Sequence, residues 1–338
     1  SLALLTGCPP VDPPSDGGVV EDAGVEDGGT NPDGGVVDGG QNDGGVEPVD
    51  GGGGGDRCAE FAFPFENPPL MPSDLTEDDA WKRRVNPNDA FFAATAFGVQ
   101  PSLKWIKFAV LVSDPTFVIF QDSNRYAFHY EFAEAHLPNF EGMTPDEFND
   151  VTLHEEGQQL LLGAVVMPQQ QGAGLAANEI GIQLVRHDPL HPEQTAQVLQ
   201  LVQDSLDGVD DAEFFYFPTF EQQCVVDNYA SYFDEQGVTI SSADRWADGD
   251  GCYVSGWAVG RLQQVAANAI DDAYISGELL PTDILVTDQV PAEIPYVAGV
   301  ISLAPSTPNS HVALLAQQYG TPFVYARTDD AIAAVNAN

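Results

Sequence analysis

The chain has 338 residues, and its 52 acidic side chains against 11 Lys and Arg give a formal net charge of −41. A chain this acidic has no broad basic surface to neutralise phosphates. This excludes a protein that coats nucleic acids and one that binds an anionic membrane through a basic face. The apolar content of 43% is ordinary for a globular protein, so we expect a folded core.

Residues 1–8 form a short apolar run that ends in Thr6-Gly7-Cys8. A run that ends in Leu-x-Gly-Cys resembles the lipobox of bacterial lipoproteins, whose Cys receives a diacylglycerol. The resemblance implies lipidation of Cys8 and a lipid anchor in the bacterial cell envelope, on the periplasmic or extracellular face. Because a full signal peptide also needs a basic segment and a longer apolar stretch, we expect the sequence to begin inside one. The alternative is an apolar start with a stray Cys.

Residues 9–57 are predicted to be a disordered linker. Residues 9–56 hold 16 glycines and 12 acidic residues, with no Lys or Arg, and Asp-Gly-Gly occurs six times. Such a segment cannot bury enough apolar surface to fold, because glycine maximises backbone entropy and like charges repel. Calcium-binding repeats are the alternative. Their known nonapeptide form has an apolar residue at a fixed place, which these irregular repeats lack.

Residues 58–250 are predicted to form a mixed α/β domain whose role the sequence leaves open. Strands over 107–112 and 116–120 flank the turn signal Asp114-Pro115, which predicts a hairpin. Further elements are expected as a helix that begins after Thr144, a strand over 159–167, a helix over 191–206, an aromatic strand over 212–217, a helix over 228–236 and a strand over 238–240.

Chemical signals in this domain are weak. The segment 124–130 concentrates an Arg, a His and three aromatic residues. This composition is typical of a binding site for a sugar ring or a phosphate, and also of a core edge where amphipathic side chains pack. We favour the core edge. No Cys-x-x-Cys or Cys/His cluster predicts a metal site. If Cys8 is lipidated, three cysteines remain, and we expect Cys224 to pair with Cys252, although the spacing alone leaves the pairing open.

The C-terminal region carries the strongest local signals. Its expected elements are a strand over 299–303, a Pro-containing loop over 305–309, a helix over 311–319 and a strand over 323–326. Ser310 is a good N-cap for the helix, and Gly320 is typical of the residue that ends one.

His311 is therefore predicted to lie in the first turn of a helix. Backbone N–H groups there lack partners and the helix dipole is positive, so a phosphoryl group on the imidazole would meet ready donors. The same field keeps the ring neutral, as a nucleophile requires. A lone His at a helix start is more often structural than catalytic.

The wider sequence around His311 is similar to a known domain. The segments, in order, are Gly256-Trp257-Ala258-Val259-Gly260, Thr282-Asp283-Ile284-Leu285-Val286, Gly299-Val300-Ile301-Ser302, Thr307-Pro308-Asn309-Ser310-His311-Val312-Ala313-Leu314-Leu315-Ala316 and Gly320-Thr321-Pro322. They resemble the swivelling phosphohistidine domain of PEP-utilising enzymes, such as pyruvate phosphate dikinase and phosphoenolpyruvate synthase. The likeness covers about 252–338, a quarter of the chain.

The resemblance implies a swivelling β/β/α domain over 251–338 and a phosphotransferase function. His311 would carry a phosphoryl group between an ATP site and an acceptor such as pyruvate. Thr307 and Ser310 would hydrogen-bond the ring or the phosphate. Mg is implied as the metal, ATP or phosphoenolpyruvate as the phosphoryl source, and an ATP-grasp domain as the partner.

The chain departs from the family pattern in two places. Gln317 stands where many members have Arg, and Ala304-Pro305 replaces a Gly-Gly pair. No ATP-grasp sequence is visible either, so we expect a fragment whose nucleotide-binding domain follows downstream. The alternative is a non-catalytic, surface-anchored binding lipoprotein that retains the swivelling-domain fold.

Overall fold

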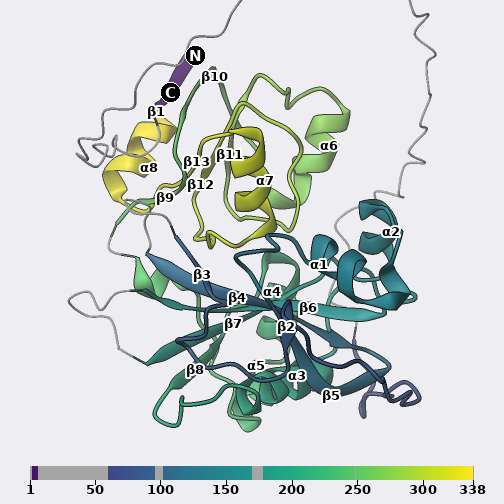
Figure 1. Cartoon of the computed structure of the whole chain (residues 1–338). Coiled ribbons are helices and arrows are strands. Elements are labelled where there is room, and N and C mark those ends of the chain that lie inside the picture. The colour runs from purple at the N-terminus through teal and green to yellow at the C-terminus, as the bar shows by residue number, and fades with distance from the viewer. Residues whose placement is uncertain (1, 7–59, 96–101, 170–177, 248, 338) are drawn as a thin grey trace, which may run out of the picture. The chain divides into compact units, whose positions relative to one another are not determined.

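The computed structural model describes residues 2–6, 60–95, 102–169, 178–247 and 249–337, with the backbone alone for 2–6. The predicted linker, Cys8 and Cys58 lie outside these ranges. Residues 1–8 and 56–338 belong to one compact unit. Its helices and two mixed sheets confirm the predicted mixed α/β class (Figure 1). None of the helices in the described ranges is long and apolar enough to cross a membrane.

The first sheet has seven strands in the described part of the chain, with the order β2-β5-β4-β6-β7-β8 and β3 beside β4. The strands are β2 (Trp81–Lys82), β3 (Ala93–Ala94), β4 (Leu103–Leu111), β5 (Asp114–Gln121), β6 (Leu160–Pro168), β7 (Glu179–Val185) and β8 (Glu213–Tyr216). Neighbours are antiparallel except β7 and β8. The predicted hairpin is confirmed, because β4 and β5 pair through Phe108 and Phe120.

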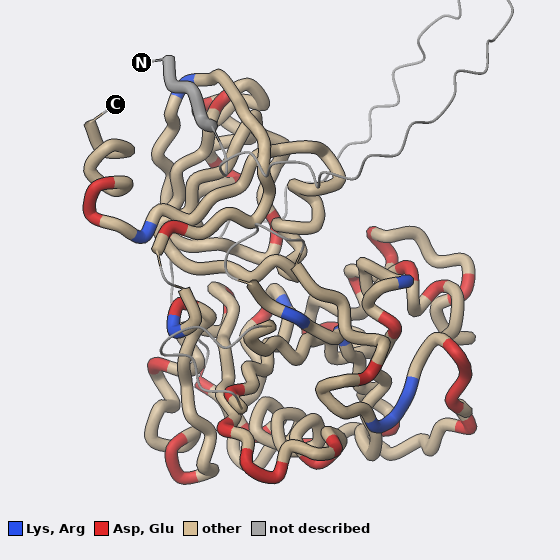
Figure 2. The backbone as a smooth tube through the Cα atoms, turned by 60° about the vertical axis from the view of Figure 1, so that its left-hand side comes forward, with Lys and Arg blue, Asp and Glu red and all other residues tan. Residues whose placement is uncertain are grey.

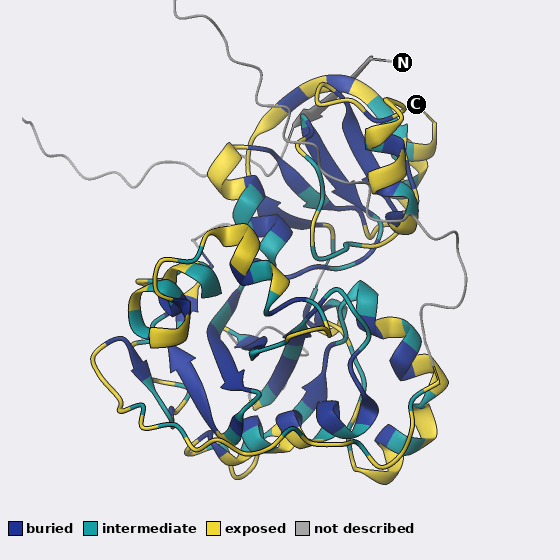
Figure 3. Cartoon of the chain, turned by 90° about the vertical axis from the view of Figure 1, so that its right-hand side faces the viewer, coloured by how far each residue is buried: buried dark blue, intermediate teal, exposed yellow. Residues whose placement is uncertain are grey.

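Both faces of this sheet are covered. One face packs on α3 (Pro192–Asp204), α4 (Phe220–Asn228) and α5 (Ala230–Glu235) through Phe108, Val198 and Phe233. The other packs on α1 (His129–His136), η1 (Pro138–Phe140) and α2 (Pro145–Asp150). Strands with two buried faces read as continuous apolar runs rather than alternating ones, which explains the sequence of β6. Figure 3 shows the strands buried and the helix surfaces exposed.

The second sheet has six strands within the described residues, in the order β1-β10-β11-β12-β13-β9. These are β1 (Leu2–Thr6), β9 (Gly251–Val254), β10 (Trp257–Gln264), β11 (Ile284–Thr287), β12 (Gly299–Ser302) and β13 (Phe323–Tyr325). β10 to β13 run parallel, and β1 and β9 are antiparallel edges. The remaining elements are η2 (Ala243–Trp246), η3 (Ala267–Ala269), α6 (Ile270–Ile275), α7 (His311–Tyr319) and α8 (Asp329–Asn336).

One helix differs from the prediction. The sequence pattern predicted a single helix over 228–236, whereas α4 begins at Phe220 and α5 follows after Tyr229. The buried face of α4 includes Gln222, which is only 1% exposed. A polar residue on the buried face hides the apolar period by which helices are recognised. The segment 238–240 forms a single bridge to Tyr216 rather than a strand.

Substitution of Gly163 by Ala tests how tightly β6 is packed. A Cβ at this position would collide with the Phe108 ring and with the backbone carbonyl of Gln183, which cannot rotate away. We expect Gly163→Ala to lower the free energy of unfolding by about 1–3 kcal/mol or more, as overpacked cores do. Urea denaturation measures this change. Gly249→Ala, where a Cβ meets open space, is the control. Equal stabilities of the two variants would contradict the packing described.

Candidate functional site

The structure places His311 where the sequence predicted it. Ser310 is the N-cap of α7, and its Oγ accepts a hydrogen bond from the Ala313 amide at 3.1 Å. Gly320 ends the helix with a left-handed backbone, φ 67°. The local signals for this helix are therefore confirmed, and His311 occupies its first turn with a side chain that is 27% exposed.

The surroundings of His311 keep its imidazole neutral. The Phe128 ring meets the imidazole edge-on, with 5.6 Å between ring centroids. Burial, and then the charges of Lys107 and His187, lower the pKa of His311 to about 4. A neutral imidazole keeps a lone pair on one nitrogen, so this side chain has the state that a nucleophile needs at neutral pH.

His311 faces a cavity of about 530 Å³, a size typical of small-molecule sites. Its wall combines residues of the first sheet and α1 with residues of the loop before α7. Polar side chains on its wall include Lys107, His129, Glu131, Gln183, Thr307 and Asn309.

A row of aligned residues crosses the first sheet beneath the cavity. Lys107 on β4 lies opposite Ala164 on β6, and Ala164 lies opposite Gln183 on β7. Residues in register across a sheet project from the same face. Since Ala164 is small, it leaves space between its two polar neighbours. The sheet register, rather than any local motif, therefore brings Lys107 and Gln183 to one wall.

Gln183 also connects the first sheet to the loop before α7. Its Oε1 accepts a hydrogen bond from Thr307 Oγ1 at 3.1 Å and one from Asn309 Nδ2 at 3.5 Å. Asn309 Oδ1 is buried without a hydrogen-bond partner among the described residues. The Ser310 hydroxyl lies 3.0 Å from Ser306 Oγ while it caps α7. Phosphate binding by Thr307 and Ser310 stays a prediction.

Lys107 is the cation that lines this cavity, whereas its sequence context predicts only a position in an apolar strand. The residue is 5% exposed. Its Nζ lies 5.7 Å from the centroid of the Phe128 ring, the same ring that meets His311. Burial lowers the pKa of Lys107 to about 7, against a small opposing effect of Glu131. A single Lys inside an apolar strand is the signal that would have identified it.

His129 lines the cavity together with Lys107. Its Nε2 lies 3.1 Å from the carbonyl oxygen of Phe108 and 3.0 Å from that of Gly163. Carbonyl oxygens only accept, so the proton resides on Nε2. Burial and then the charge of Lys107 lower the pKa of His129 to about 3, which keeps the ring neutral. The segment 124–130, for which we favoured a core edge, therefore also lines the cavity.

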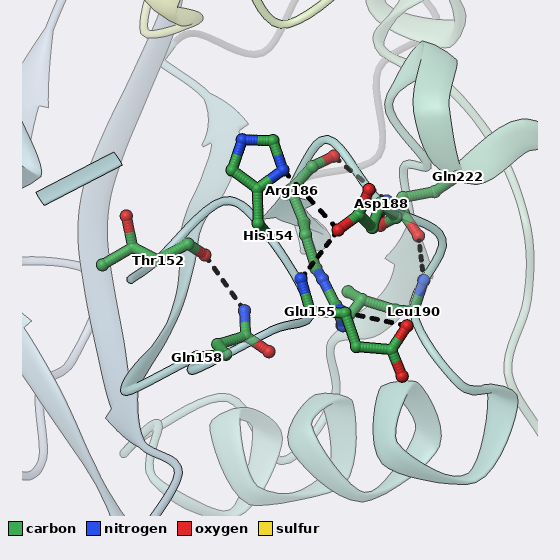
Figure 4. A network of polar contacts seen from close by, with 8 residues as sticks. All are labelled: Thr152, His154, Glu155, Gln158, Arg186, Asp188, Leu190 and Gln222. Carbon is green, nitrogen blue, oxygen red and sulfur yellow. Dashed lines mark hydrogen bonds and ion pairs between the residues drawn. The ribbon is translucent and has the colours of Figure 1, made fainter. Parts of the chain in front are cut away.

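The loop that follows β7 is held by a polar network (Figure 4). Gln222 Nε2 donates to the carbonyl oxygens of Arg186 and Asp188 at 3.2 and 2.9 Å. Gln222 Oε1 accepts from the Leu190 amide at 2.7 Å. This explains why a glutamine is buried on α4. It also fixes the backbone on both sides of His187, whose charge reaches His311.

The remaining predicted site residues lie elsewhere. Cys224 on α4 and Cys252 on β9 are both disulfide-bonded, and their pairing with each other stays a prediction. No cluster of three or more His, Cys, Asp or Glu side chains in the described ranges could hold a metal ion. We therefore assign no Mg ligand to these residues.

Lys107→Met tests whether the buried charge is as costly as its surroundings imply. The unfolded chain holds this proton up to about the ordinary pKa of 10.5, whereas the folded chain releases it near 7. The folded state is thus penalised most at and below pH 7, and the penalty fades toward pH 10.5. We expect the free energy of unfolding of Lys107→Met at pH 7 to exceed that of the parent by roughly 3–5 kcal/mol. Urea denaturation measures this difference.

The matched control is Lys82→Met, which removes a lysine paired with Asp89 at 2.6 Å. A pair of this kind contributes about 0–1 kcal/mol, so its stability should hardly change. A Lys107→Met variant that is less stable than the parent at pH 7 would contradict the assignment of Lys107 as an unpaired buried cation.

Comparison of the chain with known protein families, with curated proteins and with solved structures found no match.

Proposed function

We propose that this chain carries a phosphoryl group on His311, as a module of a PEP-synthase-like or dikinase-like phosphotransferase that is anchored to the cell envelope through Cys8. The observation that carries the proposal is the neutral imidazole of His311 at the start of α7, facing a cavity that also holds Lys107. The resemblance of residues 252–338 to phosphohistidine domains supports the same function.

The chemistry requires one free nitrogen on His311. Nδ1 lies 4.0 Å from a carboxylate oxygen of Glu293, which is beyond hydrogen-bond distance. The proposed step uses the tautomer that carries its proton on Nδ1, because its Nε2 lone pair is free. Nε2 attacks phosphorus while the bond from phosphorus to the donor's oxygen breaks. Transfer to an acceptor reverses the step: the acceptor's oxygen bonds phosphorus, and the N–P bond breaks. The positive end of the α7 dipole stabilises the phosphoryl oxygens.

ATP or phosphoenolpyruvate is proposed as the donor and a small molecule such as pyruvate as the acceptor. An ATP-grasp domain, in a longer chain or a separate protein, would load His311 from ATP. Mg would act in that domain. No step proposed for the described residues passes through the metal.

A non-catalytic binding function is the second candidate. One observation favours it: the Thr307 hydroxyl is bonded to Gln183, and the Ser310 hydroxyl caps α7. Neither hydroxyl needs a phosphate to be satisfied. In this second candidate function the cavity binds a small molecule, and His311 is one of the residues that line the cavity.

Detection of phosphohistidine separates the two functions. The protein is incubated with phosphoenolpyruvate and Mg, then analysed by mass spectrometry under alkaline conditions, in which phosphohistidine survives. We expect a phosphoryl group on His311 and none in His311→Asn. His187→Asn, which changes a neighbouring imidazole outside the proposed chemistry, serves as the matched control and should still be labelled.

The same measurement is repeated with ATP on a chain extended through any ATP-grasp domain encoded downstream. Absence of label on His311 in both experiments would overturn the phosphotransferase proposal and leave the binding function.

A further inference from the structure

Lys107 differs from the other lysines of this chain. The sequence contains three lysines in total. Lys82 Nζ pairs with Asp89 at 2.6 Å, and Lys104 Nζ donates to the Pro87 carbonyl oxygen at 2.7 Å. Lys107 Nζ makes no hydrogen bond or ion pair with any described residue, although the chain carries 52 acidic side chains. Figure 2 shows how thinly basic residues are spread among acidic ones.

The nearest acidic group does not neutralise Lys107. Glu131, on α1, acts on Lys107 only as a distant charge. Its carboxylate is held instead by the Phe128 amide, which donates to Oε2 at 3.2 Å in the capping box of α1. The neighbouring imidazoles of His129 and His311 are neutral and supply no counter-charge. The ammonium group therefore faces the cavity without an ion-paired or hydrogen-bonded carboxylate, although Glu131 and Glu293 line the same cavity.

An unpaired buried cation is costly to keep unless something compensates it. Methionine would fill the same space without the charge. A side chain that weakens the fold and points into a cavity is characteristic of a binding site, where stability is given up for function. An anion that enters the cavity from outside the chain would supply the missing ion pair.

The cavity is also too large for a simple inorganic anion. Its volume is about 530 Å³, and apolar side chains cover much of the wall around Lys107. These apolar side chains include Phe128 from the loop before α1, Leu162 from β6, Val185 from β7 and Leu315 from α7. Such a site fits a molecule with one acidic group and an apolar body.

We propose that the cavity binds a small organic anion, whose acidic group contacts Lys107 Nζ and whose carbon body packs on Phe128, Leu162 and Val185. Gln183, in register with Lys107 across Ala164, lies on the same wall as a further polar contact. This inference rests on the proposed function in one respect: the bound anion would be the small molecule that exchanges a phosphoryl group with His311. Residues 58–250 thus supply the substrate half of the site.

Lysine NMR tests the site directly, because only three lysines give signals. The protein is labelled with ¹³C at lysine Cε, and the signals are assigned with Lys82→Arg and Lys104→Arg. Phenyl phosphate is the probe with both an acidic group and an apolar body. Inorganic phosphate lacks the body, and phenol lacks the charge. We expect phenyl phosphate to shift the Lys107 signal and to bind at least tenfold more tightly than either simpler probe.

Calorimetry on variants supplies the second readout. Lys107→Met should weaken phenyl phosphate binding at least tenfold while phenol binding stays the same. Lys104→Met is the matched control, because Lys104 lies on the same strand but bonds Pro87 outside this cavity. Unchanged affinity in Lys107→Met, or a Lys107 signal that no anion moves, would overturn the proposal.

His311→Asn separates this inference from the proposed function. The anion is held by Lys107, so the variant should still bind phenyl phosphate although it cannot be phosphorylated. Lys107-dependent binding together with no phosphohistidine in either labelling experiment would overturn the phosphotransferase function and keep the anion site. Phosphohistidine formation together with phenyl phosphate binding that is unchanged in Lys107→Met would overturn the anion site and keep the phosphotransferase function.

Discussion

The two-sided burial of the first sheet is the constraint on which the site depends. Helices and loops cover both faces, so a side chain in the middle of β4 cannot reach bulk water. Most positions of β4 are therefore occupied by apolar residues. Lys107 is an exception, and its ammonium can be accommodated only because the row that it shares with Ala164 and Gln183 lies beneath a cavity.

That row also links the two sheets chemically. Gln183 accepts hydrogen bonds from Thr307 and Asn309, which precede α7. The Phe128 ring contacts Lys107 on one strand and His311 at the start of α7. The nucleophile candidate and the cation therefore share one neighbour. Burial lowers the pKa of both side chains, and the charge of Lys107 further lowers the pKa of His311.

Two histidines that line the cavity have different roles, although they are the same residue type in the sequence. His129 and His311 are both partly buried and neutral, yet His129 donates its ring N–H to two backbone carbonyls and has a structural role. His311 lines the cavity, and its ring makes no hydrogen bond with a described residue. Gln222 donates hydrogen bonds to the backbone carbonyls of Arg186 and Asp188 and so holds the loop after β7 (Figure 4).

The sequence by itself determined the elements whose signals are local. The cap at Ser310, the stop at Gly320, the position of His311 and the turn between β4 and β5 all follow from residues within a few positions of each other. Only the tertiary structure decided which distant residues meet. Thr307 and Gln183 form a hydrogen bond although they are 124 positions apart. Lys107 lies in the same row as Gln183 because of the strand register. No pattern within one strand encodes that register, because it is set by how both faces of the whole sheet are buried.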